Sequence, residues 1–344
     1  MLPADGAAAR DASTPPAEPG IHGASETARP AERIERPACD LCGADDAALM
    51  WPGSAWPAPV PPDVALRRCR RCGLAYLSPR PTPAAIGAYY PPDYAPFRTA
   101  VDDERWALMR WVRRRKLVQR RRLVERHSGR VPGAPPGRVL DVGCSTGLFL
   151  HEMQRAGWQA EGVELTPSAA RYARERFGLQ VFEGMLEAAP FAPERFDVIT
   201  YWDVLEHVYS PTETLARTAE LLAPGGLLAI NVPNWHCLER RIFGRWWAGY
   251  DPPRHLYVFT RPSLTRYLEQ AGFEPLAWTC FMPSYFTVII SLENWLRARA
   301  PALAGPVLRL LRLPGLRFLL QPPLWLLDQL GYGSVIAVFA RKRG

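Results

Sequence analysis

Lysine is nearly absent from this chain of 344 residues. It occurs only at positions 116 and 342, although lysine and arginine together number 42 and the formal net charge is +8. A charge of this size usually indicates phosphate-bearing partners such as nucleic acids or anionic membranes. The near-exclusive use of arginine, together with 36 prolines and several alanine runs, is instead typical of a GC-rich coding sequence. The arginine content therefore argues little for binding of nucleic acid.

Long apolar runs are missing as well. No segment approaches the roughly 20 apolar residues of a membrane-spanning helix. The N-terminus also shows no apolar core of a signal peptide. We therefore expect a cytoplasmic protein, in which reducing conditions favour metal binding over disulfides for closely spaced cysteines.

Cysteine is sparse but unevenly placed. Four of the seven cysteines form two similar motifs, Cys39-x-x-Cys42-Gly43 and Cys69-x-x-Cys72-Gly73. Two thiolates from each turn can surround a zinc ion tetrahedrally, and the pattern supplies no open coordination position. We therefore expect a structural zinc ion, with a pair of reduced, empty knuckles as the alternative.

The chain divides into regions of different composition. We expect a disordered tail at 1–36, a zinc-ribbon-like module at 37–98, a basic helix and linker at 99–137, an α/β core at 138–282, an apolar helical insertion at 283–333, and a final core strand with the C-terminal tail at 334–344. Strands and helices alternate in the core, which is typical of a parallel sheet with helices on both faces. The final strand is expected to pair antiparallel between two neighbours.

The insertion at 283–333 is apolar but interrupted by arginines and prolines. This pattern is wrong for a spanning helix and typical of amphipathic helices. We expect a helical cap packed on the fold. The alternatives are a peripheral contact with the inner face of the membrane and a channel for a lipid-like substrate.

A glycine-rich turn follows the first core strand, in the run from Leu140 to Gly147. Gly143 and Gly147 let the backbone approach a ligand closely, and the helix that follows offers a positive N-terminus. Asp141 precedes the first glycine by two residues. A carboxylate there suits a cationic amino group and would repel the pyrophosphate of a dinucleotide. The spacing also departs from G-x-G-x-x-G, because Ser145 occupies the place of the second glycine.

Glu164 ends the next strand, about twenty residues after the turn. An acid at this position can accept hydrogen bonds from both ribose hydroxyls. Together with Asp141, it predicts that the core binds a nucleoside whose other end carries an amino group.

The same segment resembles the class I S-adenosylmethionine-dependent methyltransferases, and especially the branch of the ubiquinone-type O-methyltransferases. The runs Phe196 to Ile199, Trp202 to Val208 and Leu222 to Gly226 also match. The resemblance covers residues 138–282 and the final strand. It implies a Rossmann-like seven-stranded sheet with helices on both faces and S-adenosylmethionine bound across the strand tips.

The resemblance also implies the roles of individual residues. Gly143, Ser145 and Gly147 would line the methionine part of the cofactor, Asp141 would hold its amino end and Glu164 its ribose. Around the rest of the cofactor it implies Leu165 against the adenine, Met185 and Leu186 near the adenine edge, and Tyr201, Trp202 and Asp203 near the sulfonium. Ser145 stands where the family commonly has glycine, and Met185 where it often has a polar residue.

Two histidines are candidates for acid–base chemistry. Methyl transfer from a sulfonium needs mainly alignment and desolvation, but an oxygen or nitrogen acceptor also loses a proton. His207 lies in the family-like run after the fourth core strand, and His255 lies in a loop after the fifth. For His207 the alternative is a packing role, and for His255 it is a place in a lid.

The sequence therefore predicts methyl transfer to a small-molecule, sugar or lipid-linked acceptor by in-line displacement. The cysteine module resembles those that precede some sugar-modifying methyltransferases. One alternative is an RNA methyltransferase that uses the cysteine module and the basic helix. Another is a cofactor-binding protein that has lost catalysis.

Overall fold

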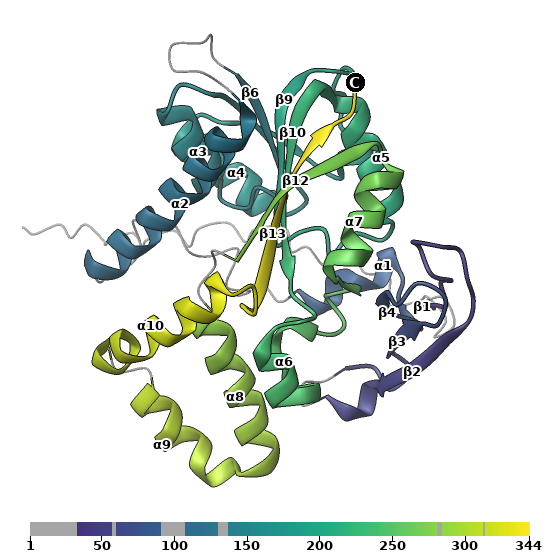
Figure 1. Cartoon of the computed structure of the whole chain (residues 1–344), viewed down its shortest axis with the longest axis vertical. Coiled ribbons are helices and arrows are strands. Elements are labelled where there is room, and N and C mark those ends of the chain that lie inside the picture. The colour runs from purple at the N-terminus through teal and green to yellow at the C-terminus, as the bar shows by residue number, and fades with distance from the viewer. Residues whose placement is uncertain (1–32, 57–59, 91–106, 130–136, 281–283, 312–313) are drawn as a thin grey trace, which may run out of the picture.

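A seven-stranded sheet with helices on both faces forms the centre of the molecule (Figure 1). The computed structural model describes residues 33–56, 60–90, 107–129, 137–280, 284–311 and 314–344. From one edge of the sheet to the other, the strands are β12 (Phe273–Thr279), β13 (Val335–Lys342), β10 (Leu222–Pro233), β9 (Phe196–Trp202), β6 (Arg138–Val142), β7 (Gln159–Glu164) and β8 (Gln180–Glu183). The predicted α/β class is confirmed.

The direction of the strands places a ligand site next to β6. This strand pairs in parallel with β7 on one side and with β9 on the other. The chain therefore reverses its order across the sheet between β6 and β9, and ligands of open α/β sheets bind at the carboxyl ends beside such a reversal. Strand β13 runs antiparallel to both β10 and β12, as the sequence predicts.

Side chains alternate between the two faces of the sheet because strand residues point up and down in turn. Val139 of β6 belongs to the core under α2 and α3, whereas Leu140 belongs to the core on the opposite face. The helices on the Val139 face are α2 (Ala107–Ser128), α3 (Leu148–Arg155) and α4 (Pro167–Phe177), and those on the Leu140 face are α5 (Pro211–Leu221) and α7 (Arg261–Gln270).

The N-terminal module is continuous with the core. Its strands are β2 (Ala47–Pro52), β3 (Ala65–Cys69) and β4 (Ala75–Leu77), with β1 (Ile34–Glu35), β5 (Arg80–Pro81) and α1 (Pro83–Ile86) beside them. The short strand β11 (Tyr257–Val258), which was not predicted, joins this sheet by pairing antiparallel with β4. Leu74 of the module and Leu268 of α7 belong to one buried apolar cluster, so the two parts share a core.

The predicted disordered tail and the predicted linker are only partly covered by the structure. Residues 1–32 of the predicted disordered tail and residues 130–136 of the predicted linker lie outside the described residues. The end of that tail was misread, because β1 pairs with β5 and Glu35 accepts a 2.6 Å hydrogen bond from Arg80.

Three helices form a separate lobe between β12 and β13. They are α8 (Tyr285–Arg299), α9 (Pro301–Leu311) and α10 (Pro314–Gln329), and α6 (Leu238–Phe243) lies beside α8. Their own small core contains Tyr285, Ile289 and Leu308. Figure 1 shows the lobe beyond the carboxyl ends of the parallel strands. Within the described ranges, no helix combines the length and the hydropathy that crossing a membrane requires.

Candidate active site

The glycine turn between β6 and α3 has the close backbone approach that the sequence predicts. Gly143 and Gly147 have φ values of 70° and 77°. A Cβ atom at Gly143 would lie 2.6 Å from Val204 Cγ2, so only glycine fits there. Ser145 also adopts a left-handed conformation, with φ of 49°. The serine therefore keeps the backbone shape that glycine would give.

Asp141 is buried at the end of β6, with 3% of its surface exposed. Thr200 of β9 donates a 2.6 Å hydrogen bond to its Oδ1. Burial raises the pKa of Asp141 to about 7, against the opposing effects of this hydrogen bond and of the Arg120 charge. A carboxyl group so placed is poised to lose its proton when a cation arrives.

Glu164 is held against the same turn. Its Oε2 accepts a 2.8 Å hydrogen bond from the backbone N–H of Ser145, and its Oε1 accepts one of 2.8 Å from that of Thr166. Each carboxylate oxygen has a further lone pair. The acid at the tip of β7 is therefore fixed in place with remaining acceptor capacity.

The other predicted contact residues separate into exposed and buried ones. Leu165 is 63% exposed and Met185 is 45% exposed. Leu186 is buried, and the Tyr201 hydroxyl lies 2.5 Å from Thr218 of α5, on the face away from α2 and α3. The Leu165 and Met185 side chains are therefore accessible from solvent, whereas the Tyr201 side chain is buried.

Asp203 follows β9 and turns toward the site. It has a left-handed φ of 59°, and its Oδ1 accepts a 2.8 Å hydrogen bond from Asn231 of β10. Neighbouring Trp202 packs edge-on against Phe149, with ring centroids 5.4 Å apart. The tip of β9 is thereby fixed from both sides.

Sequence reasoning missed Arg120, which α2 carries to the tip of β9. Its guanidinium lies 4.9 Å from the Trp202 ring centroid and 3.6 Å from Asp203 Oδ2. Burial lowers the pKa of Arg120, and the charges of Asp203 and Asp141 oppose that effect. Many arginines occur on this helix, so the sequence alone gave no signal that distinguishes this one.

The two candidate histidines lie together, with ring centroids 4.6 Å apart. His207 Nδ1 is 3.0 Å from the carbonyl oxygen of Arg254, and His255 Nδ1 is 3.0 Å from that of Gly249. A carbonyl oxygen only accepts, so both rings carry a proton on Nδ1 and leave Nε2 as an acceptor. Burial lowers the pKa of His207 to about 3, so this ring is neutral at physiological pH.

A buried carboxyl group completes the cluster. Glu206 is 0% exposed, and neither of its carboxyl oxygens has a hydrogen-bond partner within the described part of the chain. Burial raises the pKa of Glu206 well above its usual range. Ligand atoms of Glu206, His207 and His255 all lie within 4.8 Å of one another. Three groups that offer lone pairs would fit around a shared proton or a divalent cation.

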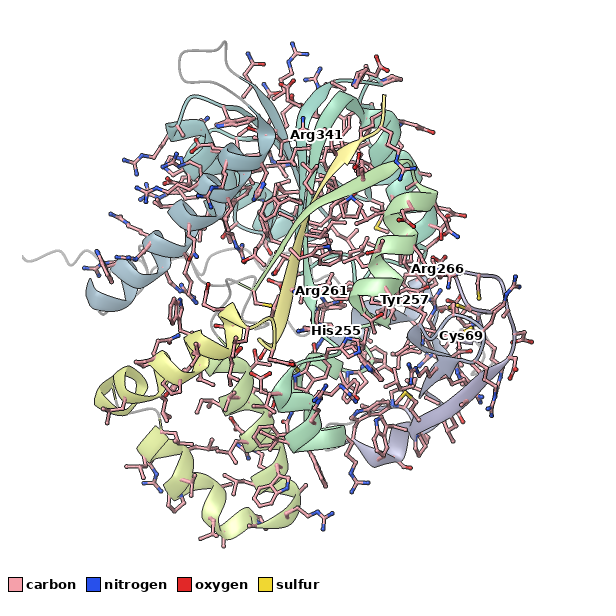
Figure 2. All side chains as sticks on the ribbon, viewed as in Figure 1. Cys69, His255, Tyr257, Arg261, Arg266 and Arg341 are labelled. Atoms are coloured by element: carbon pink, nitrogen blue, oxygen red, sulfur yellow. The ribbon has the colours of Figure 1, made fainter. Side chains whose placement is uncertain are left out.

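The N-terminal module reaches this cluster directly. The Tyr90 hydroxyl lies 3.1 Å from His207 Nδ1, and Arg254 Nη1 donates a 3.2 Å hydrogen bond to the Tyr89 carbonyl. Leu77 of β4 donates a 2.9 Å backbone hydrogen bond to Leu256. Figure 2 shows His255 and Tyr257 on the side of the sheet toward the module that carries Cys69.

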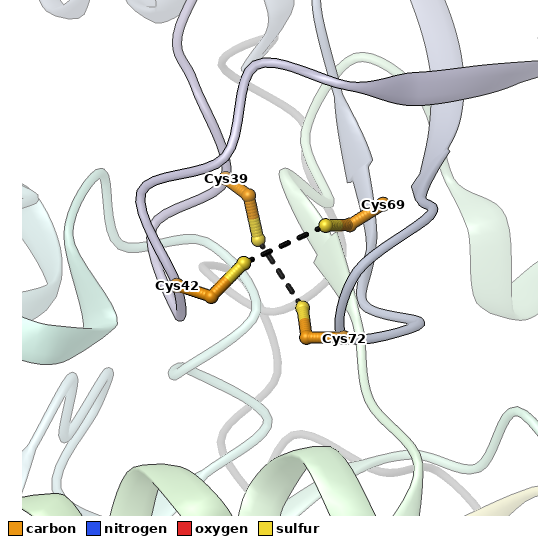
Figure 3. A group of neighbouring side chains, drawn as sticks. All are labelled: Cys39, Cys42, Cys69 and Cys72. Atoms are coloured by element: carbon orange, nitrogen blue, oxygen red, sulfur yellow. Dashed lines mark hydrogen bonds between the residues drawn. The ribbon is translucent and has the colours of Figure 1, made fainter.

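The four cysteines of the module converge (Figure 3). The Cys39 and Cys72 sulfurs are 3.4 Å apart, and those of Cys42 and Cys69 are 3.6 Å apart. A tetrahedron with Zn–S bonds of about 2.3 Å has sulfurs about 3.8 Å apart, whereas a disulfide requires about 2.05 Å. The arrangement therefore matches an unbonded set of four zinc ligands.

Known proteins share the core of this chain. A family model described as a methyltransferase domain matches residues 111–277. Ubiquinone biosynthesis O-methyltransferase from Aromatoleum aromaticum is 35% identical over 170 residues, covering 46% of this chain and 72% of that protein. Its counterpart from Cereibacter sphaeroides is 31% identical over 163 residues, covering 41% and 66%. A solved methyltransferase from Archaeoglobus fulgidus has a TM-score of 0.45 and 18% identity, covering 72% and 96%.

The chain therefore belongs to the class I S-adenosylmethionine-dependent methyltransferases, and it is an enzyme of that class. Among curated proteins, it is similar to the ubiquinone biosynthesis O-methyltransferases. The resemblance predicted from the sequence is confirmed, and the cofactor class with it. The cysteine module precedes the residues that the methyltransferase family model matches.

Proposed function

We propose that this enzyme transfers the methyl group of S-adenosylmethionine to a hydroxyl oxygen of a small-molecule acceptor, either free or linked to a sugar or lipid. The observation that carries the proposal is the cluster of His207, His255 and Glu206. Glu206 and His207 follow Asp203 closely in the chain, His255 joins them from a distant loop, and the cluster offers proton acceptors. The names of the curated relatives, which are O-methyltransferases, support the same acceptor atom.

The cofactor is proposed to bind between the tips of β6, β7 and β9. Asp141 takes the amino group, because a buried acid with a raised pKa gains most from a cation. Arg120 takes the carboxylate at the same end of the methionine. At the nucleoside end, Glu164 accepts from the ribose hydroxyls and the exposed Leu165 and Met185 cover the adenine.

The glycine turn supports this placement of the cofactor. Gly143, Ser145 and Gly147 expose their backbone to the ligand, and the first turn of α3 adds its positive end. We assign Tyr201 a contribution by its backbone alone, because its side chain packs toward α5. Leu186 is assigned the same limited role, since its side chain is buried.

For the chemical step, His255 is proposed to accept the proton of the acceptor hydroxyl at its Nε2. The neighbouring His207 acts as a positioning residue, because burial makes its protonation unfavourable near neutral pH. S-adenosylmethionine already carries an activated leaving group. The protein therefore contributes mainly by aligning the acceptor oxygen with the methyl group and by excluding water.

A divalent cation at Glu206, His207 and His255 is a second use of the same cluster. Each histidine donates its Nδ1 proton to a backbone carbonyl, which is how metal-binding histidines are commonly oriented. Such a cation would lower the pKa of a hydroxyl bound to it. Sensitivity of turnover to a chelator separates this use from proton transfer by His255.

The four cysteines are proposed to hold a structural zinc ion. Gly43 and Gly73 have positive φ values of 69° and 79° and close the two similar turns. A closed set of four thiolates leaves no position for a substrate. Because β4 pairs with β11, this zinc ion would stabilise the loop that carries His255.

RNA as the acceptor is less well supported by the basic helix α2. Arg121 forms ion pairs with Glu125 and Glu152, and Arg120 points into the cofactor site. These two arginines therefore serve contacts within the protein, and among the described side chains of α2 only exposed arginines such as Arg122 remain for phosphate contacts. Formation of S-adenosylhomocysteine with phenolic or sugar acceptors, but not with RNA, is the expected outcome. Labelling of RNA alone would contradict the proposal.

A further inference from the structure

One exposed face of α10 is apolar from Leu319 onward. Four of its exposed side chains follow helical spacing, Leu319, Pro322, Pro323 and Leu326, and the exposed Leu330 comes directly after the last helical residue, Gln329. The three leucines are 73%, 54% and 62% exposed. Spacings of i, i+3, i+4 and i+7 place the four helical residues on one side of the helix. A contiguous exposed apolar face of this kind marks an interaction site.

The apolar surface continues over the rest of the lobe. Further exposed apolar side chains are Ile290 and Trp295 of α8, Leu303 and Leu310 of α9, and Trp325 of α10. The inner sides of the helices already pack on one another through the small core around Ile289 and Leu308. The outer sides are therefore additional to what the lobe needs for its own packing. We call these outer sides of α8–α10 the lobe surface.

The charges around the lobe surface are mostly positive. Within the described side chains of α8–α10, the exposed charged residues are Arg297, Arg299 and Arg309. Glu293 pairs with Arg297 at 2.7 Å, and Asp328 is buried against Ser284. Arg299 also lies over the Trp246 ring, 5.0 Å from its centroid.

We propose that the lobe surface docks on an anionic lipid bilayer and lies in its interfacial layer. Amphipathic helices with leucine and tryptophan on one side and arginine beside them bind in this way, by apolar burial and by attraction to anionic headgroups. Tryptophan prefers this layer because its ring is apolar and its N–H is polar. The proposal is independent of which acceptor the enzyme methylates.

A second copy of the chain fits the lobe surface less well. A two-fold contact places the same patch on both sides of the interface. The arginines of one copy would then approach those of the other, with few acids to compensate. Anionic headgroups complement this charge, whereas a second copy repeats it.

Docking through the lobe surface would bring the proposed cofactor site close to the bilayer. Lys116 of α2 lies over the ring of Phe286 on α8, 5.3 Å from its centroid. The same helix α2 carries Arg120 at the tip of β9. Figure 1 shows the lobe beyond the carboxyl ends of the parallel strands, the edge at which the cofactor is proposed to bind. A membrane-resident acceptor would therefore meet the enzyme on its active face.

Vesicle co-sedimentation of the full chain tests the proposal. The probes are vesicles of phosphatidylcholine alone and of phosphatidylcholine with one quarter phosphatidylglycerol. We expect partition onto the anionic vesicles that weakens as salt rises from 50 to 500 mM. The double variant Leu326→Glu/Leu330→Glu should reduce partition at least about tenfold, because it places two charges in the buried layer.

A matched control variant is Leu49→Glu, which changes a leucine of similar exposure (57%) on β2, away from the lobe. It should bind vesicles like the wild type, and both variants should bind S-adenosylhomocysteine normally if folded. Equal partition of the double variant and the wild type would overturn the proposal. The proposal would also be overturned if the wild type bound neither kind of vesicle. A dimer that the double variant abolishes would then show that a second copy of the chain covers the lobe surface.

Discussion

Thr200 of β9 donates a 2.6 Å hydrogen bond to the buried carboxyl group of Asp141 on β6. This hydrogen bond holds the Asp141 side chain in place at the end of the central strand β6, directly before the glycine turn. Burial nevertheless dominates and raises the pKa of Asp141 to about 7. The proposed cofactor site therefore holds a group whose charge changes near physiological pH, and several measurable consequences depend on it.

Cofactor binding should strengthen as the pH rises from 6 to 8. Asp141 is protonated below about pH 7 in the free protein, and an ammonium group beside it favours the ionised form, so binding releases a proton. Each pH unit below 7 should weaken binding of S-adenosylhomocysteine up to about tenfold. Calorimetry on the wild type and on Asp141→Asn measures this. The variant should lack this part of the pH dependence, and an unchanged pH profile would contradict the role of Asp141.

The stability of the free protein should show the opposite trend. The pKa of Asp141 is raised on folding from about 3.9 to about 7, so the folded state retains a proton that the unfolded state loses between these values. The free energy of unfolding contributed by this group therefore falls as pH rises through that window. Urea titrations at pH 5 and pH 8 should show a smaller difference for Asp141→Asn than for the wild type.

Arg120→Ala should weaken binding of S-adenosylhomocysteine about tenfold or more, because a charged hydrogen bond to its carboxylate is lost. Its sequence neighbour provides the control. Arg121 pairs with Glu125 and Glu152, so Arg121→Ala should lower stability slightly and leave the dissociation constant unchanged. Equal effects of the two substitutions on affinity would show that Arg120 has no special role.

His255→Ala should lower turnover about 100-fold or more, as expected on loss of a general base, while leaving cofactor affinity intact. Treatment with a chelator, applied to the wild type and to Glu206→Gln, then distinguishes the two proposed uses of the cluster, proton transfer and binding of a divalent cation. If only a proton is shared, the chelator has no effect on turnover. If a divalent cation binds there, turnover falls with the chelator and returns with added metal. Wild-type turnover in His255→Ala would remove this histidine from the mechanism.

Zinc analysis of the purified protein should give about one ion per chain. Cys42→Ser should release this ion and lower the melting temperature by roughly 5–10 °C, because the module shares its core with α7. Cys280→Ser, in a buried cysteine outside the group, is the control and should keep its zinc. A protein that folds equally well without zinc would contradict a structural metal.

Local patterns in the sequence were enough to predict the parts of the site that neighbouring residues build. The turn from Asp141 to Gly147 and the two cysteine motifs each depend on spacings of a few residues. The alternation of strands and helices also predicted an α/β sheet with helices on both faces, and the resemblance to methyltransferases implied its seven strands.

Contacts between distant segments were not predictable in this way. Arg120 reaches Asp203 across 83 positions of the chain, and β4 pairs with β11 across about 180. Nothing in the composition of α2 distinguishes Arg120 from its neighbours. The short strand Tyr257–Val258 has no periodicity of its own and forms because the module supplies its partner.

The central claim, methyl transfer to the oxygen of a small or lipid-linked acceptor, is tested most directly by a labelling experiment. The enzyme is incubated with cell extract and S-adenosylmethionine labelled in its methyl group, and the products are separated into polar small molecules, lipids and RNA. The account predicts that label enters the lipid or polar fraction, as an acid-stable methyl ether, and that His255→Ala lowers the rate of labelling about 100-fold or more. Label in RNA alone, or equal labelling by His255→Ala, would contradict the account.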